Sequence, residues 1–263
     1  MTVSAAPVVG LVPAAGRADR LGPLPCSKEI FPVGFRDAGG GPRPVCEHLL
    51  EAFRDAGVHR AFVLLRKGKW DVPAFLGRGL DAGAAGALHL AYLALDPTAG
   101  VPETIDCAYP FVADHSVALG FPDILFEPRD AFRRLRERQA ATGAPVVLGL
   151  FPAEAPEKTD MVELDDAGRV RRLVIKQAAT ALAYTWSIAL WQPELTRYLH
   201  EYLARRDPGE TRELYLGEVI QAAIDDGFAV EAVTFPGGSY LDVGTPEDLE
   251  RAVAAAVGDP GRK

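Results

Sequence analysis

The sequence predicts an α/β fold, in which a mixed, mostly parallel central sheet is flanked by helices in a Rossmann-like arrangement, with a small β-hairpin subregion. Through residues 1–150, short apolar runs alternate with amphipathic helical segments, as in parallel sheets with crossover helices. Further on, the turn Asp165-Asp166-Ala167-Gly168 separates two β-rich runs, which indicates a hairpin. The 263 residues, 48% of them hydrophobic, suffice for one core. We therefore expect a single domain over residues 1–258 and a frayed tail over residues 259–263.

The first half of the chain supplies the parallel part of this sheet. Buried parallel strands are short, continuous apolar runs, and these are expected at residues 8–13, 61–65, 87–95, 117–120 and 145–151. The first helix is predicted from apolar residues at helical spacing between Val45 and Ala56, with Gly57 as its stop. Further helices are expected at residues 103–112 and 128–142, and a glycine-rich connection at residues 77–86.

The second half changes its pattern. The hairpin is expected at residues 160–164 and 170–176, and further strands at residues 184–191 and 229–235. Helices are expected at residues 195–204, 214–226 and 246–257. In sheets of this kind, ligands bind at the carboxyl ends of the strands.

Charge and composition narrow the class of partner. With 28 Lys+Arg against 36 Asp+Glu, the net charge of −8 argues against nucleic acid or an anionic membrane as the main partner. The sequence has neither an apolar run long enough to span a bilayer nor the basic flank typical of a signal peptide, so we expect a cytoplasmic protein. A homo-oligomer is a possible assembly. The three cysteines form no CxxC pair, and the five histidines form no HxH or HxxxH pair.

The most informative stretch follows the first strand. The small residues Pro13, Ala14, Ala15 and Gly16 allow backbone N–H groups to approach a phosphate closely, and Arg20 and Lys28 add two cations. The stretch matches neither the P-loop pattern nor the GxGxxG fingerprint. On composition alone, a tight surface loop with solvated charges is the alternative.

This stretch resembles the signature of nucleotidyltransferases that act on sugar 1-phosphates, such as the glucose-1-phosphate thymidylyltransferases. That signature reads roughly (A/P)-A-G-x-G-x-R, then a spacer and P-K-x-L-x-P-V; here residues 15–20 read AGRADR and residues 27–33 read SKEIFPV. Ala18 replaces the second glycine, and Ser27 replaces the proline. Residues 119–126, LGFPDILF, are similar to the family's L-G-D-N-x-F element, and residues 240–249, YLDVGTPEDL, to its W-x-D-x-G-T-x-x-x-L element. The resemblance spans Val9 to about Ala252.

The resemblance implies a nucleotidyltransferase fold and a reaction between two anions. In the family, the phosphate of the acceptor attacks the α-phosphorus of a nucleoside triphosphate and expels pyrophosphate, so catalysis is positioning and charge neutralisation. It implies Mg²⁺ held by Asp123 and Asp242, Arg20 on the leaving pyrophosphate and Lys28 near the transferring phosphate. Taken alone, each aspartate is more typical of a cap or a turn.

The resemblance also indicates where the two substrates bind. Gly100 and Glu103 lie in a segment that resembles the base-contacting segment, and Leu95 or Asp96 stands where thymidylyltransferases have a glutamine, which leaves the base open. Lys176, where the family has E-K-P, is expected to hold the acceptor phosphate, although its preceding glutamate is missing. Thr159-Asp160 replaces a common Tyr-Gly pair.

Two further residues are candidates for acceptor binding. Trp186 is expected to line the acceptor pocket, with core packing as the alternative. Glu213 lies in a segment that resembles G-E-L-E-I-T-D, with a solvated helix face as the alternative.

The expected function is Mg²⁺-dependent transfer of a nucleotide, with dTTP as the leading donor, to a sugar 1-phosphate, giving a nucleotide sugar and pyrophosphate. One alternative is cytidylyl or uridylyl transfer to a different phosphorylated or phosphonate acceptor. Another is a catalytically silent, nucleotide-binding regulatory relative, which the presence of Arg20, Lys28, Asp123 and Asp242 disfavours.

Overall fold

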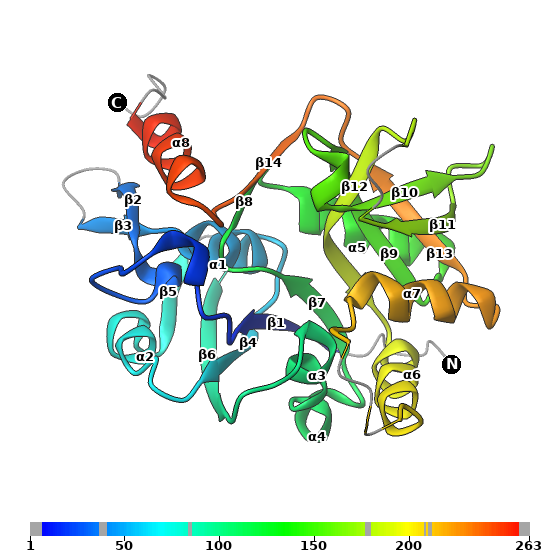
Figure 1. The fold of residues 1–263 in the computed structure, drawn as a ribbon, viewed down its shortest axis with the longest axis horizontal. Helices are drawn as coiled ribbons and strands as arrows, with labels where there is room; N and C mark the ends of the chain where they lie inside the picture. The colour runs from blue at the N-terminus through cyan, green and yellow to red at the C-terminus, as the bar shows by residue number, and fades with distance from the viewer. Residues whose placement is uncertain are drawn as a thin grey trace.

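A central strand organises the sheet. In the computed structural model, which describes residues 7–36, 41–83, 86–176, 180–207, 209 and 212–257, β1 (Val8–Ala14) lies in the middle of a ten-stranded sheet (Figure 1). The strand order is β11-β10-β12-β7-β1-β4-β6-β5, and β9 and β13 continue the sheet beside β12. The mixed sheet flanked by helices confirms the predicted fold class.

The strands around β1 are parallel. β4 (Arg60–Arg66) and β7 (Ser116–Gly120) flank β1, and β6 (Gly86–Leu95) pairs in parallel with β4. Their carboxyl ends therefore meet at one edge of the sheet, where a ligand can reach the loops that follow them.

The other half of the sheet is mainly antiparallel. β12 (Tyr184–Trp191) runs antiparallel to β7 and to β9 (Val146–Pro152). The predicted hairpin is confirmed as β10 (Asp160–Leu164) and β11 (Val170–Ile175), which join the sheet through β12, while β13 (Val230–Thr234) pairs in parallel with β9.

Helices cover both faces of the sheet. α1 (Glu47–Asp55) and α5 (Ala131–Thr142) share one core, in which Phe53 and Phe132 pack edge to face at 4.8 Å. The other core packs under α3 (Val101–Asp106), α4 (Tyr109–Val112), α6 (Pro193–Ala204) and α7 (Leu216–Asp225). α8 (Pro246–Val257) lies apart, against β2 (Pro32–Phe35) (Figure 1).

Several short elements differ from the prediction. The expected connection at residues 77–86 contains β5 (Gly79–Gly83), an edge strand antiparallel to β6. The single helix expected at residues 103–112 is divided into α3 and α4, because Pro110 has no N–H to continue a helical ladder. Elements of three to six residues were too short for periodicity to predict: β3 (Pro42–Pro44), α2 (Asp71–Leu76), β14 (Ser239–Asp242) and the 3₁₀ turns Asp19–Leu21, Lys28–Ile30 and Pro156–Lys158.

Two expectations lie beyond what these ranges cover. Residues 259–263, the expected frayed tail, are outside the described residues, and so is Gln177 of the E-K-P-like segment. Among the helices that are described, none has the length and apolar character needed to cross a membrane.

Candidate active site

Two aspartates that are distant in sequence meet beside the central sheet. β8 (Ile124–Glu127) pairs antiparallel with β14, and this register sets Asp242 opposite Ile124, the residue after Asp123. The backbone N–H of Val243 donates a hydrogen bond of 2.9 Å to the carbonyl oxygen of Asp123. The predicted pair therefore lies in one place, on a two-stranded ribbon that we call the β8–β14 ribbon.

Two cations complete the cluster. The Lys28 ammonium forms an ion pair with the Asp123 carboxylate, and each side chain is 16% exposed. The Arg20 guanidinium packs over Gly244, where a Cβ atom would lie 2.9 Å from Nη2 of Arg20. The end of the Arg20 side chain therefore lies against Gly244, beside Asp242. The structure thus brings together the four residues that were predicted to neutralise charge and bind the metal: Arg20, Lys28, Asp123 and Asp242.

The charges of this cluster shift the pKa values of its members. Burial alone would lower the pKa of Lys28, but the charge and hydrogen bond of Asp123 outweigh it, so that the pKa is raised. Burial, and then the negative charge of Asp123, raise the pKa of Asp242 to about 6, against the opposing effects of Lys28 and Arg20. An additional positive charge near Asp242 would therefore stabilise its ionised carboxylate.

A buried ion pair supports the loop that carries Lys28. Lys69 donates to Oε1 of Glu29 at 2.6 Å and to the carbonyl oxygen of Ala14 at 2.9 Å. Burial raises the pKa of Glu29, against the lowering effect of Lys69. Because Lys69 joins the end of β1 to the residue after Lys28, it fixes both ends of the signature loop, residues 15–28. This role of Lys69 was not predicted, because the residue lies in a short polar stretch that matches no motif.

A second support explains one departure from the family signature. The backbone N–H and the hydroxyl of Ser27 donate to the two carboxylate oxygens of Asp71, at 2.6 and 2.8 Å. Proline, the family's residue at this position, could make neither bond. Ser27 nevertheless has φ −58° and ψ 138°, angles that proline also adopts. The Asp71 bonds therefore hold Ser27 in the conformation that a proline ring would impose.

A cavity of about 440 Å³ lies at the signature loop, and we call it the signature-loop cavity. The predicted residues that line it are Pro13, Ala15, Gly16, Gly100, Lys28, Asp123 and Glu213. Two predicted nucleotide contacts, Ala14 and Glu103, are not among its lining residues. Ala14 is buried on the opposite side of β1, because successive strand residues point to opposite faces, and Glu103 forms an ion pair of 3.0 Å with Arg206.

A second cavity of about 400 Å³ lies beside the hairpin and is called the hairpin cavity. The three predicted acceptor residues, Lys176, Trp186 and Glu213, all line it, together with Arg20 and Asp242. Three residues, Val101, Phe121 and Glu213, line both cavities, so the two adjoin there. The charged cluster is divided between them, with Arg20 and Asp242 lining the hairpin cavity and Lys28 and Asp123 lining the signature-loop cavity. The Lys176 ammonium lies 3.6 Å from the centroid of the Tyr215 ring, a cation–π contact.

The donor set of the cluster suits a hard divalent cation that keeps open positions. Within the described ranges, no group of three or more His, Cys, Asp or Glu side chains gathers to form a complete metal cage. Asp123 and Asp242 supply two carboxylates, and Mg²⁺ is typically held by one or two carboxylates, with water and substrate phosphates as the remaining ligands. The residues present therefore fit Mg²⁺ better than they fit a closed structural metal site.

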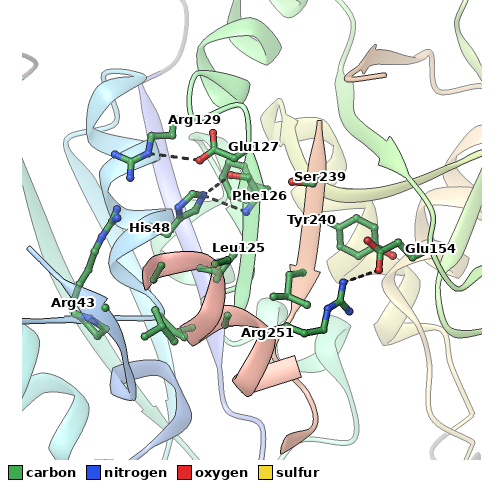
Figure 2. Close-up of a pocket in the computed structure, with 18 residues that line it drawn as sticks. Arg43, His48, Leu125, Phe126, Glu127, Arg129, Glu154, Ser239, Tyr240 and Arg251 are labelled. Atoms are coloured by element: carbon green, nitrogen blue, oxygen red, sulfur yellow. Dashed lines mark hydrogen bonds and ion pairs between the residues drawn. The ribbon is translucent and has the colours of Figure 1, made fainter. Parts of the chain in front are cut away.

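A third cavity, of about 430 Å³, lies on the other side of the β8–β14 ribbon and is called the ribbon cavity (Figure 2). Its charged side chains are already paired: Arg251 with Glu154 at 2.9 Å, and Arg129 with Glu127 at 3.8 Å. His48 is bonded through Nε2 to the backbone carbonyl of Phe126 at 2.6 Å. This cavity therefore lies at the interface of α8, α1 and the β8–β14 ribbon, and these charged side chains pair with neighbouring residues.

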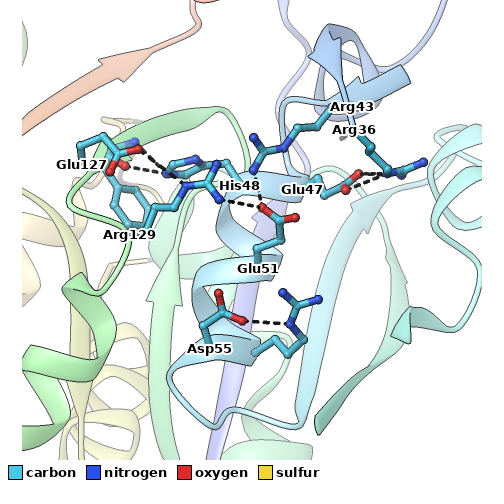
Figure 3. Close-up of polar contacts among 10 residues, drawn as sticks. Arg36, Arg43, Glu47, His48, Glu51, Asp55, Glu127 and Arg129 are labelled. Carbon is cyan, nitrogen blue, oxygen red and sulfur yellow. Dashed lines mark hydrogen bonds and ion pairs between the residues drawn. The ribbon is translucent and has the colours of Figure 1, made fainter. Parts of the chain in front are cut away.

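The acidic side chains of α1 also have local partners. Glu47, Glu51 and Asp55 follow one another along the helix, and each is paired with an arginine (Figure 3). Glu51 contacts both Arg43 and Arg129, and so connects β3 with the segment after β8. The pairs of Glu47 and Glu51 join α1 to its neighbours, and that of Asp55 lies within the helix. The charged cluster of Arg20, Lys28, Asp123 and Asp242, in contrast, lines two open cavities.

Comparison with known proteins gives consistent matches over nearly the whole chain. The model of the nucleotidyl transferase family matches residues 9–257. A low-salt glycan biosynthesis nucleotidyltransferase, Agl11, from Haloferax volcanii is 25% identical over 97% of this chain and 67% of its own length. A glucose-1-phosphate thymidylyltransferase from an Actinoplanes species is 27% identical over 93% of this chain and 76% of its own length. The solved structure of a UTP-bound UGPase from Acinetobacter baumannii has the same fold, with a TM-score of 0.78 and 16% identity over 97% of this chain and 95% of that one.

Proposed function

This chain belongs to the nucleotidyl transferase family, and we propose that it joins a nucleoside triphosphate to a sugar 1-phosphate, with release of pyrophosphate. An oxygen of the acceptor phosphate attacks the α-phosphorus of the triphosphate. The bond from that phosphorus to the bridging oxygen of the β-phosphate breaks, and pyrophosphate leaves with the electron pair. The acceptor is already an anion, so no side-chain nucleophile is needed.

One observation carries this proposal: two adjoining cavities share the charged cluster, with Lys28 and Asp123 lining one of them and Arg20 and Asp242 lining the other. The signature-loop cavity would hold the triphosphate and the hairpin cavity would hold the acceptor, so the two phosphates would meet beside Lys28 and Arg20. The main barrier to this reaction is repulsion between two polyanions, and fixed positive charge in a partly buried site reduces it. The raised pKa of Lys28 keeps its ammonium charged at neutral pH.

Mg²⁺ is the proposed cofactor, with Asp123 and Asp242 as its protein ligands. The ion, when bound, neutralises and orients phosphate oxygens. With Mg²⁺ on the Asp123 carboxylate, Lys28 would no longer be paired with Asp123. Its ammonium would then be available to the transferring phosphate. Arg20 would hold the leaving pyrophosphate through its planar fork.

We propose dTTP as the nucleotide and a hexose 1-phosphate as the acceptor. The signature motifs and the thymidylyltransferase relative favour this pair. A different pyrimidine triphosphate with another phosphorylated or phosphonate acceptor is the competing assignment, because the residues at positions 96, 159 and 160 depart from the family pattern.

The test is release of pyrophosphate by the purified chain from a panel of nucleoside triphosphates and acceptors, with Mg²⁺ or with EDTA. We expect turnover with dTTP and a hexose 1-phosphate, and its loss in EDTA. Tight nucleotide binding without pyrophosphate release from any pair would instead identify a silent regulatory relative.

A further inference from the structure

A lysine in the hairpin cavity is held by an aromatic ring rather than by an acidic side chain. The Lys176 ammonium lies 3.6 Å from the centroid of the Tyr215 ring, and both residues line the cavity. Burial raises the pKa of Asp160 to about 6, and the charge of Lys176 opposes this rise, so a carboxyl group is near as well. Within the described residues, however, Lys176 forms no ion pair with this or any other carboxylate. The ring of Tyr215 is therefore the contact that fixes the ammonium.

The backbone of Lys176 is strained. Its φ of 43° lies in the left-handed region, which residues other than glycine rarely adopt. Lys176 directly follows Ile175, the last residue of β11, so this conformation sets the direction in which the lysine side chain leaves the hairpin. Strain of this kind persists only where the surrounding structure fixes it, and it is concentrated at ligand-binding and catalytic sites. The strained backbone therefore supports a role for Lys176 in ligand binding.

The start of α7 holds Tyr215 in place. The backbone N–H of Tyr215 donates a hydrogen bond of 2.9 Å to Oε2 of Glu218, and the N–H of Glu218 donates one of 3.0 Å to the carbonyl oxygen of Tyr215. The residues on either side, Leu214 and Leu216, are buried in the core. The backbone of Tyr215 is thus fixed on both sides, which makes its ring a fixed support for the ammonium.

α7 is in turn attached to the hairpin that carries Lys176. Oε1 of Gln221 accepts a hydrogen bond of 2.7 Å from the backbone N–H of Leu173, in β11. At the start of the helix, a Cβ atom on Gly217 would lie 2.4 Å from Oδ2 of Asp160, in β10, so the absence of a side chain allows the helix to pack directly against the hairpin. These two contacts fix the ring on α7 relative to the lysine that follows β11.

An aromatic ring positions a cation without neutralising it. The ring face attracts the ammonium through its quadrupole but brings no negative charge, so Lys176 keeps its full charge for an incoming anion. A carboxylate partner would instead have to be displaced by the anion, as in the pair of Lys28 and Asp123. An ammonium has three N–H donors, and those that face away from the ring stay available to phosphate oxygens.

We propose that Tyr215 is a positioning residue for the acceptor: its ring holds the Lys176 ammonium in the hairpin cavity, with the charge unpaired, where the ammonium binds the phosphate group of the acceptor. The inference rests on the proposed function, because it takes the hairpin cavity as the acceptor site. Tyr215 acts through Lys176 and needs no contact with the acceptor. The ring face is the part that acts, so phenylalanine should replace tyrosine here and leucine should not.

The experiment measures binding of hexose 1-phosphate by calorimetry, separately from turnover. The variants are Tyr215→Leu, Lys176→Ala and the double variant, and Tyr215→Phe is the conservative variant that keeps the ring. Thermal unfolding checks that each is folded. A second measurement uses the unmodified chain. Because a ring current shields protons held above an aromatic ring, the NMR signal of the Lys176 ε-methylene group, assigned by its loss in Lys176→Ala, reports the contact directly.

We expect Tyr215→Leu to weaken binding of hexose 1-phosphate by roughly 2- to 30-fold, the range that corresponds to one cation–π contact. KM for the acceptor should rise more than kcat falls. Tyr215→Phe should recover most of this loss. In the Lys176→Ala background, Tyr215→Leu should have no further effect, because the ring acts only through the ammonium. The ε-methylene signal should be shifted upfield in the unmodified chain and in Tyr215→Phe.

Other results would overturn the inference. These are binding by Tyr215→Leu as tight as that of the unmodified chain, equal losses in Tyr215→Leu and Tyr215→Phe, or additive losses in the double variant. A Lys176 ε-methylene signal at the position of a solvated lysine would overturn it even if Tyr215→Leu does not fold. The proposed function fails separately, through absence of pyrophosphate release from a chain that binds hexose 1-phosphate with this dependence on the ring. Absence of hexose 1-phosphate binding to the unmodified chain would contradict both.

Discussion

On the signature-loop side of the site, Lys28, Lys69 and Ser27 each already have an acidic partner, whereas on the hairpin side the charges of Lys176 and Asp160 form no ion pair within the described ranges. The cations and the loop of the first side are therefore held in place before a ligand arrives, although Oε2 of Glu29 and Nε of Arg66 have no hydrogen-bond partner there within the described ranges. The second side is left with unpaired charges, at a cost in stability that a bound ligand can recover. A site that must neutralise the same triphosphate in every turnover benefits from rigidity, and a site that must choose among acceptors benefits from groups that only the correct acceptor satisfies.

The largest expected effect on the signature-loop side comes from removing the negative charge that is proposed to bind Mg²⁺. Asp123→Asn keeps the shape and an oxygen that accepts from Lys28, but it loses the negative charge that would hold Mg²⁺. We expect kcat to fall by more than the ~10²–10³-fold that removal of one electrostatic donor costs. Steady-state rates over a Mg²⁺ titration measure this effect, and the circular dichroism spectrum should not change. Rates equal to those of the unmodified chain would remove Asp123 from the proposed metal site.

Removing the cation is expected to have the next largest effect. Lys28→Ala takes away the charge beside Asp123, and kcat should fall by about 10²–10³-fold while KM for the acceptor changes much less. Lys28→Arg is the matched control, because it keeps the charge but not the compact geometry, and it should recover only part of the rate. An unchanged kcat in Lys28→Ala would mean that the ion pair with Asp123 is only structural.

A smaller effect is expected when the support of the loop is removed and Lys28 is left in place. Asp71→Ala removes the acceptor of the two hydrogen bonds that Ser27 donates, and we expect kcat to fall by about 10-fold through loss of positioning. Adding Ser27→Pro should restore most of the rate, since Ser27 already has the φ of a proline. If the double variant is as slow as Asp71→Ala, then Asp71 acts through something other than the conformation of residue 27.

The two sides also differ in how much of them the sequence could predict. The resemblance to the family's motifs predicted Arg20, Lys28, Asp123 and Asp242 as one group, and the structure brings them together. Their supports, Lys69 and Asp71, were not found, because a buried ion pair or a bond to a backbone N–H leaves no pattern in one sequence.

On the hairpin side, Lys176, Trp186 and Glu213 were predicted to contact the acceptor, and all three line the hairpin cavity. The contact of Lys176 with Tyr215 was not predicted, because it depends on the packing of α7 against the hairpin, which is a tertiary fact. The strands were predicted well where they are long and apolar, and β14, which places Asp242, was too short to predict.

The stability cost on the hairpin side can be measured directly. Because the pKa of Asp160 is raised to about 6 in the folded chain, the folded state binds the proton more tightly than the unfolded state does. The free energy of unfolding should therefore fall as the pH rises from about 4 to about 6, and then level off. Asp160→Asn should remove this contribution and be more stable than the unmodified chain by roughly 1–3 kcal/mol at pH 7, with little gain at pH 4.

Urea unfolding at several pH values, without ligand, measures this difference. Asp71→Asn is the matched control on the signature-loop side, because hydrogen bonds to Ser27 lower the pKa of Asp71 despite its partial burial. Its difference from the unmodified chain should have the opposite sign, a loss of stability that is greatest above pH 4. Equal pH profiles for both variants would contradict the contrast between the two sides.

The smallest expected effect concerns the one strained position of the signature loop. Ala18, which stands where the family has glycine, has φ 60° and ψ 29°, a left-handed conformation that costs a residue with a Cβ atom about 1–2 kcal/mol. Ala18→Gly should relieve that strain but add entropy to the unfolded chain, for a net gain of roughly 0.5–1 kcal/mol in the free energy of unfolding. Ala155→Gly, at a residue with φ −136°, is the control and should lose stability by roughly 0.4–1 kcal/mol. Urea unfolding of the two variants separates the outcomes by sign, and a loss in Ala18→Gly as large as that in the control would mean that the loop holds Ala18 without strain.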